Sequence, residues 1–434
     1  MEKEVKPAAS LNGILNPPPD KSISHRSALF AALSDDVSII QNYSVAADPQ
    51  STLSCLRKLG VGCEQVGGET TIKISGVGRD GFSKPAELLD CGNSGTTMRL
   101  LGGILAGAGV PSVLTGDESL SSRTMKRIID PLIDMGCRIS GRQGLYAPLQ
   151  IERHDGVKGI KFPLPIPSAQ LKSAVLLTGL FGEEPTEVIE KIQSRDHTER
   201  LLELHSEVSD VGRIIRSSRT DRIPAQTYTI PGDFSAAAFW LVAGVIHANS
   251  SIELKNVGIN PTRTAVISIL EEMGASFHFE NMRAEGKEPV ADILIHSAEL
   301  NAINPDPALF PNCIDELPIL MVAMCFAEGR SIIRGAEELR HKETDRLAAM
   351  AEIFNRSGAK IELTPDGMVI DGNRDFRPKS ATYPTWHDHR IAMASAILAS
   401  KSKSHSLIEN AECTAISYPD FWDHLNELTY AFKE

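Results

Sequence analysis

Six stretches of the chain repeat one pattern, in which a polar turn rich in Gly and Pro leads into a run of small and apolar residues. They begin at Pro19, Gly92, Pro167, Pro231, Asp315 and Asp388, and they read PDKSISHRSALFAALS, GNSGTTMRLLGGILAG, PSAQLKSAVLLTGL, PGDFSAAAFWLVAGVI, DELPILMVAMCFAEG and DHRIAMASAILAS. Each predicts a helix that starts at its turn. The starts lie about 65 to 85 residues apart, too far for a solenoid repeat but suited to a supersecondary unit used six times. Because a helix N-terminus attracts anions, six such starts predict a site for a negatively charged small molecule.

A second pattern follows within each repeat: a polar start, an amphipathic helix and often a Gly before a strand-like run. These segments are DPQSTLSCLRKLGVGCE, SRTMKRIIDPLIDMGCRIS, TRTAVISILEEMGASFHF and ETDRLAAMAEIFNRSGAKIEL, with weaker matches in SRDHTERLLELHSEVSDVGRII and SYPDFWDHLNELTYAF. The terminal Gly is the expected C-cap. Strand candidates between the helices are TTIKISG, APLQIER, QTYTIPG, SSIELKNV and DILIHS. Each repeat therefore predicts two helices and several strands.

The six repeats divide naturally into three plus three, and 434 residues exceed the usual size of a single core. The midpoint falls near Ile230–Phe234, where PGD follows a strand. We therefore predict one domain over 20–230 and a second from 1–19 plus 231–434. The strand-like run before Pro19 would then return to the second domain and leave a two-strand hinge.

The net charge of -12 argues against a nucleic-acid partner, which would favour a basic surface. Lys and Arg nevertheless recur in the repeated turns, which favours a pocket for a small anion. The N-terminus MEKEVKPAAS lacks an apolar core, so neither a secretory signal nor a transit peptide is expected. Apolar stretches near Ala236–Ala248 and Ile319–Ala327 are too short for a bilayer, and seven cysteines without a CxxC pair indicate free thiols. We expect a cytoplasmic protein without a membrane partner.

Two motifs are discounted. Gly76–Gly81 matches GxGxxG after a strand-like run, but Phe82-Ser-Lys-Pro follows where a dinucleotide site needs a helix, so a hairpin loop is the better interpretation. His387-Asp388-His389 offers two possible metal ligands, yet adjacent residues do not share a helix face and no third ligand is in register. A capping Asp388 is the simpler interpretation.

Two helix starts carry candidate anion-binding groups. Lys21, Ser22 and Arg26 follow three prolines, and Ser22 and Arg26 are four residues apart and so share a helix face. Asn93–Thr97 places a small turn and hydroxyl groups at another start, where Gly95 permits close approach to the backbone. Without the other copies, an ordinary Gly-rich turn with a cap would explain this second start equally well.

The densest ionisable cluster is Arg340–Arg346, in which Lys342 and Arg346 are four apart and Glu343 lies beside Lys342. A solvated helix start explains that segment alone equally well. Asp315 opens the fifth repeat before Glu316, where an acidic residue is also expected simply as a cap. Arg123, Arg195 and Arg390 stand near helix starts and could form bidentate bonds to carboxylate or phosphate.

Taken together, PDKSISHR, GNSGTTMRLL, SRTM, PSAQLKSA, RHKETDR and DHRIAMA closely resemble the 5-enolpyruvylshikimate-3-phosphate synthase family over nearly the whole chain. The resemblance implies an α/β fold of two similar domains, each of three βαβαββ units around a pseudo-threefold axis (an inside-out α/β barrel), with a ligand cleft between them. It implies transfer of the enolpyruvyl group of phosphoenolpyruvate to the 5-hydroxyl of shikimate 3-phosphate, with release of phosphate. We expect a protein that needs no cofactor and no metal; the sequence leaves the oligomeric state open, and a monomer is the prediction.

The resemblance also assigns site residues. The positions implied for shikimate 3-phosphate are Lys21, Ser22, Arg26, Ser168, Ala169, Gln170, Ser194, Arg195, Asp315 and Lys342. Those implied for phosphoenolpyruvate are Lys21, Asn93, Gly95, Thr96, Arg123, Gln170, Arg346 and Arg390. The implied catalytic groups are Asp315, which accepts the hydroxyl proton, Glu343, which protonates the methylene carbon, and Lys21, an acid near the bridging oxygen.

The chain departs from the family pattern at two positions. Ala169 stands where many members have a second Ser, and Ile416 replaces a Lys of one branch; with SRDHTER, they place the chain nearer a second bacterial branch. Gly95 keeps the small residue associated with glyphosate access. One alternative is a UDP-N-acetylglucosamine enolpyruvyl transferase, but Lys21 is followed by Ser22 where that enzyme has Asn, and Gly116–Thr124 has no Cys. The other is a noncatalytic phospho-ligand binder, which would not need Lys21, Asp315 and Glu343 together.

Overall fold

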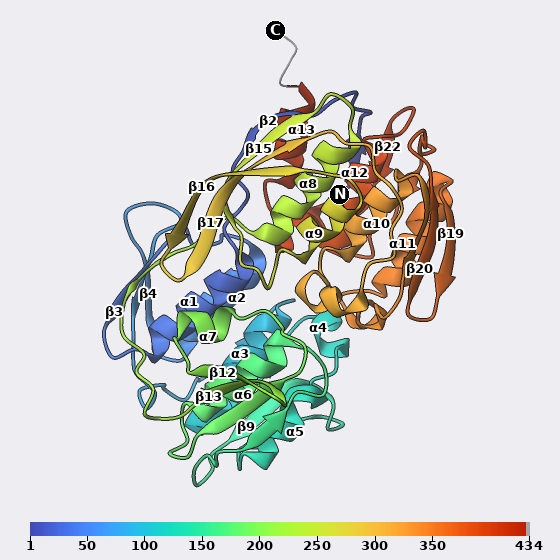
Figure 1. Ribbon diagram of the computed structural model, residues 1–434. Helices are drawn as coiled ribbons and strands as arrows, with labels where there is room; N and C mark the ends of the chain where they lie inside the picture. Colours follow the sequence, from blue (N-terminus) through green and yellow to red (C-terminus); the bar gives the residue numbers. More distant parts are fainter. Residues whose placement is uncertain (431–434) are drawn as a thin grey trace. The chain divides into compact units, whose positions relative to one another are not determined.

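The computed structural model describes residues 1–430, which form two compact units. The terminal unit comprises Met1–Pro18, Pro231–Ala284 and the chain from Glu288 onward, and the central unit comprises Pro19–Ile230 with Glu285–Lys287. Within each unit, helices occupy the interior and sheets lie outside them (Figure 1). Each unit has its own cluster of buried apolar side chains. This helices-in, sheets-out arrangement is the α/β architecture that the repeats predict.

The six repeated stretches all form helices, as predicted. They are α1 (Lys21–Leu33), α3 (Gly95–Ala108) and α6 (Ala169–Gly179) in the central unit, and α8 (Phe234–Ile246), α10 (Leu317–Cys325) and α12 (His389–Ala399) in the terminal unit. Nearly all their residues are buried, because small side chains allow neighbours to approach on every face. Five of them have an Asp or Ser cap that accepts a hydrogen bond from the first turn: Asp20, Ser94, Ser168, Asp233 and Asp388.

Helix α10 is the exception, and the expectation that Asp315 caps it is wrong. Its N-cap is Glu316, which makes no capping bond with its side chain, and Pro318 lies in its first turn. The Asp315 carboxylate instead faces Arg346 and Lys342. An acidic residue before this helix therefore has a role other than capping.

The second pattern also forms helices. They are α2 (Ala47–Lys58), α5 (Lys126–Asp134), α7 (His197–Leu201), α9 (Ala265–Glu272), α11 (Arg346–Ser357) and α13 (Phe421–Tyr430); Ala431 and Phe432 of the predicted last segment lie outside the described residues. The expected glycine C-cap is clearest at Gly358, which ends α11 with φ of 80°. Short elements complete the described chain: α4 (Glu118–Ser122), η1 (Pro307–Asn312), η2 (Glu337–His341) and η3 (Ala411–Ile416).

Each unit has three sheets among the described residues. In the central unit their strand orders are β14 (Thr227–Thr229), β3 (Val37–Gln41), β5 (Ile72–Ser75), β4 (Gly62–Gln65); β6 (Leu89–Asp90), β7 (Ser112–Thr115), β9 (Tyr146–Glu152), β8 (Arg138–Arg142); and β10 (Lys161–Pro163), β11 (Thr186–Glu190), β13 (Gly212–Ser217), β12 (Ser206–Ser209). In the terminal unit they are β16 (Phe277–Glu285), β17 (Glu288–His296), β15 (Ser251–Gly258), β2 (Asn12–Leu15); β18 (Gly329–Ile333), β20 (Gly367–Gly372), β19 (Lys360–Thr364); and β1 (Lys3–Val5), β22 (Ser406–Ile408), β21 (Thr382–Tyr383). The five strand candidates from the sequence are confirmed as β5, β9, β14, β15 and β17.

The four-stranded sheets share one topology. In each sheet, one edge strand pairs in parallel with the strand that follows a buried helix, as β6 does with β7 and β10 with β11. That strand pairs antiparallel with one arm of a hairpin, as β7 does with β9 and β11 with β13. The N-terminal β2 completes the β15 sheet in the same manner, although it lies far from it in sequence. Repeated topology thus accompanies the repeated sequence.

The Gly76–Gly81 segment is not a hairpin loop. It follows β5 and leads by an irregular segment to β6, which belongs to a different sheet. Gly78 has φ of 69°, and no helix begins there, so the dinucleotide interpretation remains excluded.

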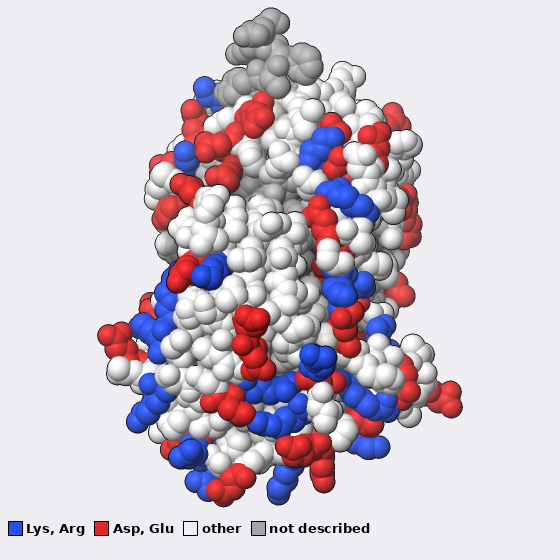
Figure 2. All heavy atoms as spheres, turned by 90° about the vertical axis from the view of Figure 1, so that its left-hand side faces the viewer, with Lys and Arg blue, Asp and Glu red and all other residues white. Residues whose placement is uncertain are grey.

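Acidic and basic side chains are intermixed over the face that Figure 2 shows. Ion pairs occur among the described residues, as between Arg216 and both Glu187 and Glu207. Within residues 1–430 no helix is both long enough and apolar enough to cross a membrane.

Candidate active site

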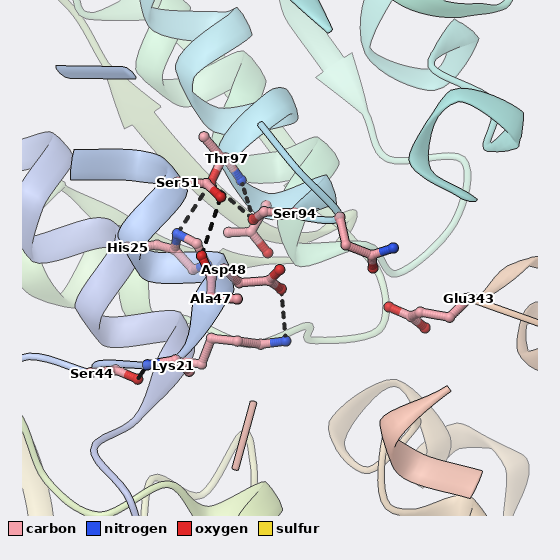
Figure 3. Close-up of polar contacts among 12 residues, drawn as sticks. Lys21, His25, Ser44, Ala47, Asp48, Ser51, Ser94, Thr97 and Glu343 are labelled. Atoms are coloured by element: carbon pink, nitrogen blue, oxygen red, sulfur yellow. Dashed lines mark hydrogen bonds and ion pairs between the residues drawn. The ribbon is translucent and has the colours of Figure 1, made fainter. Parts of the chain in front are cut away.

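The start of α1 presents Lys21 beside an acidic partner on α2. The Asp20 carboxylate caps the helix by accepting a hydrogen bond from the Ile23 N–H at 2.8 Å. Lys21 Nζ lies 3.1 Å from Asp48 Oδ2, and the lysine side chain is 16% exposed (Figure 3). Asp48 therefore fixes a cation that is still accessible to a small molecule.

Arg26 lies one turn further along α1 and is buried. Its Nε donates to Thr198 Oγ1 at 2.8 Å, and its terminal nitrogens donate to Ser173 Oγ and the Ser22 carbonyl, both at 3.1 Å. The guanidinium joins α1 to α6 and α7. Ser22 and Arg26 both lie in α1, four residues apart, as the predicted shared face requires.

Asn93 and Arg123 come together at the start of α3. The side-chain oxygen of Asn93, Oδ1, accepts a hydrogen bond from Arg123 at 2.9 Å, and the side-chain nitrogen, Nδ2, donates to Asp117 at 2.8 Å. Arg123 also donates to Ser119 Oγ at 3.0 Å. These contacts fix a guanidinium beside the helix N-terminus, where anions are favoured.

A second bridge joins the starts of α3 and α6. Gln170 donates to Thr96 Oγ1 at 2.9 Å and accepts from Arg99 at 2.6 Å. A Cβ on Gly95 would lie 2.7 Å from Arg99 Nη1 and 3.6 Å from Arg123 Nη1. The missing side chain at Gly95 therefore makes room for two guanidinium groups.

The third helix start, at α6, is capped by Ser168 and continues through Ala169 into Gln170. Nearby Ser194 is buried, and both its N–H and its hydroxyl donate to Glu190, at 3.1 and 2.9 Å. Glu190 is in turn paired with buried Lys172, which also contacts Glu199 at 2.7 Å. Arg195 follows directly, before α7 begins at His197.

Arg346 is the centre of the candidate groups in the terminal unit. Its nitrogens lie 2.8 Å from Asp388, 2.6 Å from Glu343 and 3.3 Å from Asp315. Lys342 also approaches Asp315, at 3.8 Å. The structure thus brings together four of the predicted residues, with Lys342 and Glu343 in the segment before α11 and not on the helix face.

Burial and charge oppose each other at Arg346. Burial alone would lower the pKa of the guanidinium, but Asp388, Glu343 and Asp315 raise it far above its usual range. Arg346 therefore stays charged although its side chain is only 1% exposed. A permanent buried cation between carboxylates orients the acidic side chains around it.

Asp388 performs two tasks in the same unit. Its carboxylate pairs with Arg346, and it caps α12 by accepting from the Arg390 N–H at 2.8 Å. Arg390 is buried, donates to the Ser235 carbonyl at 3.1 Å and lies over the Phe239 ring at 5.9 Å. The capping prediction for Asp388 is confirmed, but the ion pair with Arg346 was not foreseen.

The structure adds four polar residues that the sequence did not single out: Asp48, Arg99, Asp117 and Glu190. Asp48, Arg99 and Asp117 contact predicted site residues from distant segments, whereas Glu190 contacts Ser194 from only four residues away. Asp48 carried a weak signal, since it is an acidic residue in the first turn of a predicted helix. Over residues 1–430 no group of three or more His, Cys, Asp or Glu side chains is arranged to hold a metal ion.

Comparisons with known proteins identify the family of this chain. The family model of EPSP synthase (3-phosphoshikimate 1-carboxyvinyltransferase) matches residues 5–425. The 3-phosphoshikimate 1-carboxyvinyltransferase of Salinibacter ruber is 48% identical over 99% of this chain and 100% of its own, and that of Syntrophomonas wolfei is 45% identical over 96% and 97%.

Solved structures confirm the fold. The EPSP synthase of Acinetobacter baumannii superposes with a TM-score of 0.85 at 37% identity, covering 99% of this chain and 98% of that one. The enolpyruvyl transferase NikO from Streptomyces tendae shares the fold at 16% identity, with a TM-score of 0.76 and coverage of 98% and 96%. The resemblance drawn from the six motifs is therefore confirmed, and this chain belongs to the EPSP synthase family.

Proposed function

We propose that this protein transfers the enolpyruvyl group of phosphoenolpyruvate to the 5-hydroxyl of shikimate 3-phosphate and releases phosphate, a step in chorismate and aromatic amino acid biosynthesis. The observation that carries the proposal is the Arg346 cluster, in which Asp315 and Glu343 are held on one guanidinium in a chain of this family. Two carboxylates on a permanent cation provide a base and an acid beside a place for an anion.

The reaction proceeds by addition and elimination. Asp315 accepts the proton of the 5-hydroxyl while the hydroxyl oxygen forms a bond to C2 of phosphoenolpyruvate. Glu343 donates a proton to C3, and the product of this addition is a tetrahedral intermediate. In the elimination C3 loses a proton to the Glu343 carboxylate, the bond from C2 to the phosphate oxygen breaks and phosphate departs. Lys21 supplies a proton at the bridging oxygen. A noncatalytic binder would not need this acid–base set.

The candidates also bind the two anionic substrates, and Lys21, Asp315 and Arg346 appear here again. For phosphoenolpyruvate they are Lys21, Asn93, Gly95, Thr96, Arg123, Gln170, Arg346 and Arg390. For shikimate 3-phosphate they are Lys21, Ser22, Arg26, Ser168, Ala169, Gln170, Arg195, Asp315 and Lys342. Between Ser194 and Arg195 we favour Arg195 for the phosphate, because the only hydroxyl hydrogen of Ser194 is donated to Glu190.

A phosphate-release assay tests the function. We expect purified protein to release phosphate only when both substrates are present. Absence of release with shikimate 3-phosphate, together with release on a UDP-N-acetylglucosamine acceptor, would replace the proposal with the alternative transferase.

Two substitutions test the acid–base roles. Asp315→Ala and Glu343→Ala should each lower kcat by about 10²- to 10⁴-fold, the usual contribution of a general acid or base. Shikimate 3-phosphate binding, measured by calorimetry, should persist in both. Lost binding with normal turnover of the bound substrate would contradict the assignment.

We also propose that the protein acts as a monomer in the cytoplasm. The seven free thiols support that location. Light scattering on a sizing column tests the oligomeric state, and a mass near 47.1 kDa is expected. A mass of twice this value would rule out the monomer.

A further inference from the structure

A buried histidine lies one turn behind Lys21 on α1, and the mechanism above does not use it. His25 is fully buried, and its Nδ1 lies 2.7 Å from Thr52 Oγ1 on α2. Lys21 and Asp48 form the neighbouring contact, four residues earlier on each helix. Residues four apart share a helix face, so the two contacts form successive rungs between α1 and α2 (Figure 3).

The second rung continues as a chain of hydroxyl groups into α3. Thr52 Oγ1 lies 2.8 Å from Thr97 Oγ1, which donates to Ser94 Oγ at 2.9 Å. Ser94 also accepts the Thr97 backbone N–H at 3.1 Å as the N-cap of α3. All four side chains are fully buried, so water does not compete for their hydrogen bonds.

The hydrogen atoms in this chain fix its direction. Thr97 has one hydroxyl hydrogen, and that hydrogen goes to Ser94. Thr52 must therefore donate to Thr97, and His25 Nδ1 must donate to Thr52. The imidazole is then the neutral Nδ1–H tautomer, and buried Nε2, which has no hydrogen-bond partner in the described structure, carries only a lone pair. Burial lowers the pKa of His25 well below its usual value, and the charges of Lys21 and Arg26 lower it further, so the ring stays neutral.

We propose that His25 is a positioning residue for phosphoenolpyruvate: its Nδ1–H, through Thr52 and Thr97, sets the Ser94 cap and holds the α3 start in register with Lys21. The proposal rests on the proposed function, because it assigns Lys21, Asn93, Gly95 and Thr96 to that substrate. One end of the chain lies beside Lys21 on α1, and the other end is the cap between Asn93 and Gly95. Loss of the donor loosens the α3 half of the phosphoenolpyruvate subsite, while Asp48 still holds Lys21.

The test compares three substitutions at His25. Asn places an amide N–H where Nδ1–H was, whereas Gln extends the amide toward the Nε2 end, and Leu removes the donor. His25→Leu and His25→Gln should raise KM for phosphoenolpyruvate about tenfold, equal to about 1.4 kcal/mol. Both should leave KM for shikimate 3-phosphate and kcat within about twofold. His25→Asn should restore KM to within about threefold of wild type.

Substitutions at Thr52 provide the matched control in case His25 variants fail to fold. Thr52→Val removes the hydroxyl without changing shape and should repeat the His25→Leu effect, whereas Thr52→Ser should not. Equal increases in both KM values, or no increase with either Leu or Val, would overturn the proposal.

Nitrogen NMR of the wild-type protein labelled at histidine tests the tautomer without any activity. An Nδ1–H signal for His25 is expected, and an Nε2–H signal would overturn the relay. If wild-type protein releases no phosphate from the two substrates, the proposed function fails instead. The NMR result then still decides the direction of the relay.

Discussion

At the scale of single residues, His247 makes the stability of the terminal unit depend on pH. It is buried at the end of α8, where Nδ1 donates to the Ala243 carbonyl at 2.8 Å and Nε2 faces Ser400 Oγ at 3.1 Å. Burial, reinforced by the charge of Lys401, lowers the pKa of His247 to about 3. The folded unit therefore keeps this ring neutral, while the unfolded chain titrates it near pH 6.5.

The sign of the effect follows from proton uptake. Below pH 6.5 the unfolded state binds a proton that the folded state excludes, so the stability contributed by neutral His247 is complete above pH 6.5 and is lost as pH falls toward 3. The advantage of wild type over His247→Asn in free energy of unfolding should shrink by about 1.2 kcal/mol between pH 6 and pH 5. Urea unfolding measures it, with exposed His278→Asn as control. An advantage over His247→Asn that is constant with pH would contradict the prediction.

Residue types at helix starts were predictable from sequence because anion chemistry demands them locally. Their partners were not, since contacts such as Lys21 with Asp48 and Arg99 with Gln170 join segments 27 and 71 residues apart. Asp388 shows most clearly which contacts the sequence can predict and which it cannot. Its cap is local and was predicted, whereas its pairing with Arg346 bridges 42 residues.

At the scale of elements, the buried helices depend on glycines at their closest approach. A Cβ added to Gly103 on α3 would lie 2.7 Å from the carbonyl oxygen of Ala174 on α6 and 3.0 Å from the Cα of Ala174. Gly102, its neighbour, would meet only Ile128 and Leu149 methyl groups at 3.8 and 3.9 Å. Gly103→Ala should therefore lower the free energy of unfolding by about 1–3 kcal/mol, the usual effect of overpacking.

The matched substitution should have the opposite sign. Gly102→Ala fits the available space and gains helix propensity, so it should raise the free energy of unfolding by about 0.5–1 kcal/mol. Denaturant melts of the two variants decide the matter. An equal change in the free energy of unfolding for the two variants would mean that α3 and α6 can move apart without loss of stability.

Helices were more predictable than their connections. A run of small and apolar residues after a polar turn has few alternatives to a buried helix, and all six copies form one. The loop from Gly76 to Gly81 was misassigned because glycines indicate a turn but not which strands it joins. The cap at Asp315 was misassigned because an acid before a helix satisfies either its N–H groups or a distant cation, here Arg346.

At the scale of the whole molecule, the chain enters the terminal unit twice. Strands β1 and β2 pair with β22 and β15, and Val5, Leu11 and Leu15 are buried there. The central unit is inserted between Pro18 and Pro231, and its apolar cluster shares no residue with the other. The two junctions lie close together, because the Asp233 N–H donates to the Pro18 carbonyl at 2.7 Å.

This connectivity predicts which pieces fold alone. Residues 19–230 should fold by themselves, as should a chain in which a short Gly-Ser linker joins Pro18 to Pro231. Residues 231–434 alone should not fold, since they lose a strand from each of two sheets and three buried side chains, at about 1.5–3 kcal/mol each, against about 5–15 kcal/mol for a whole domain. Thermal melts and amide NMR dispersion distinguish the pieces. If 231–434 folds as well as the linked chain, the N-terminal strands are dispensable; if 19–230 stays unfolded, the two cores depend on each other.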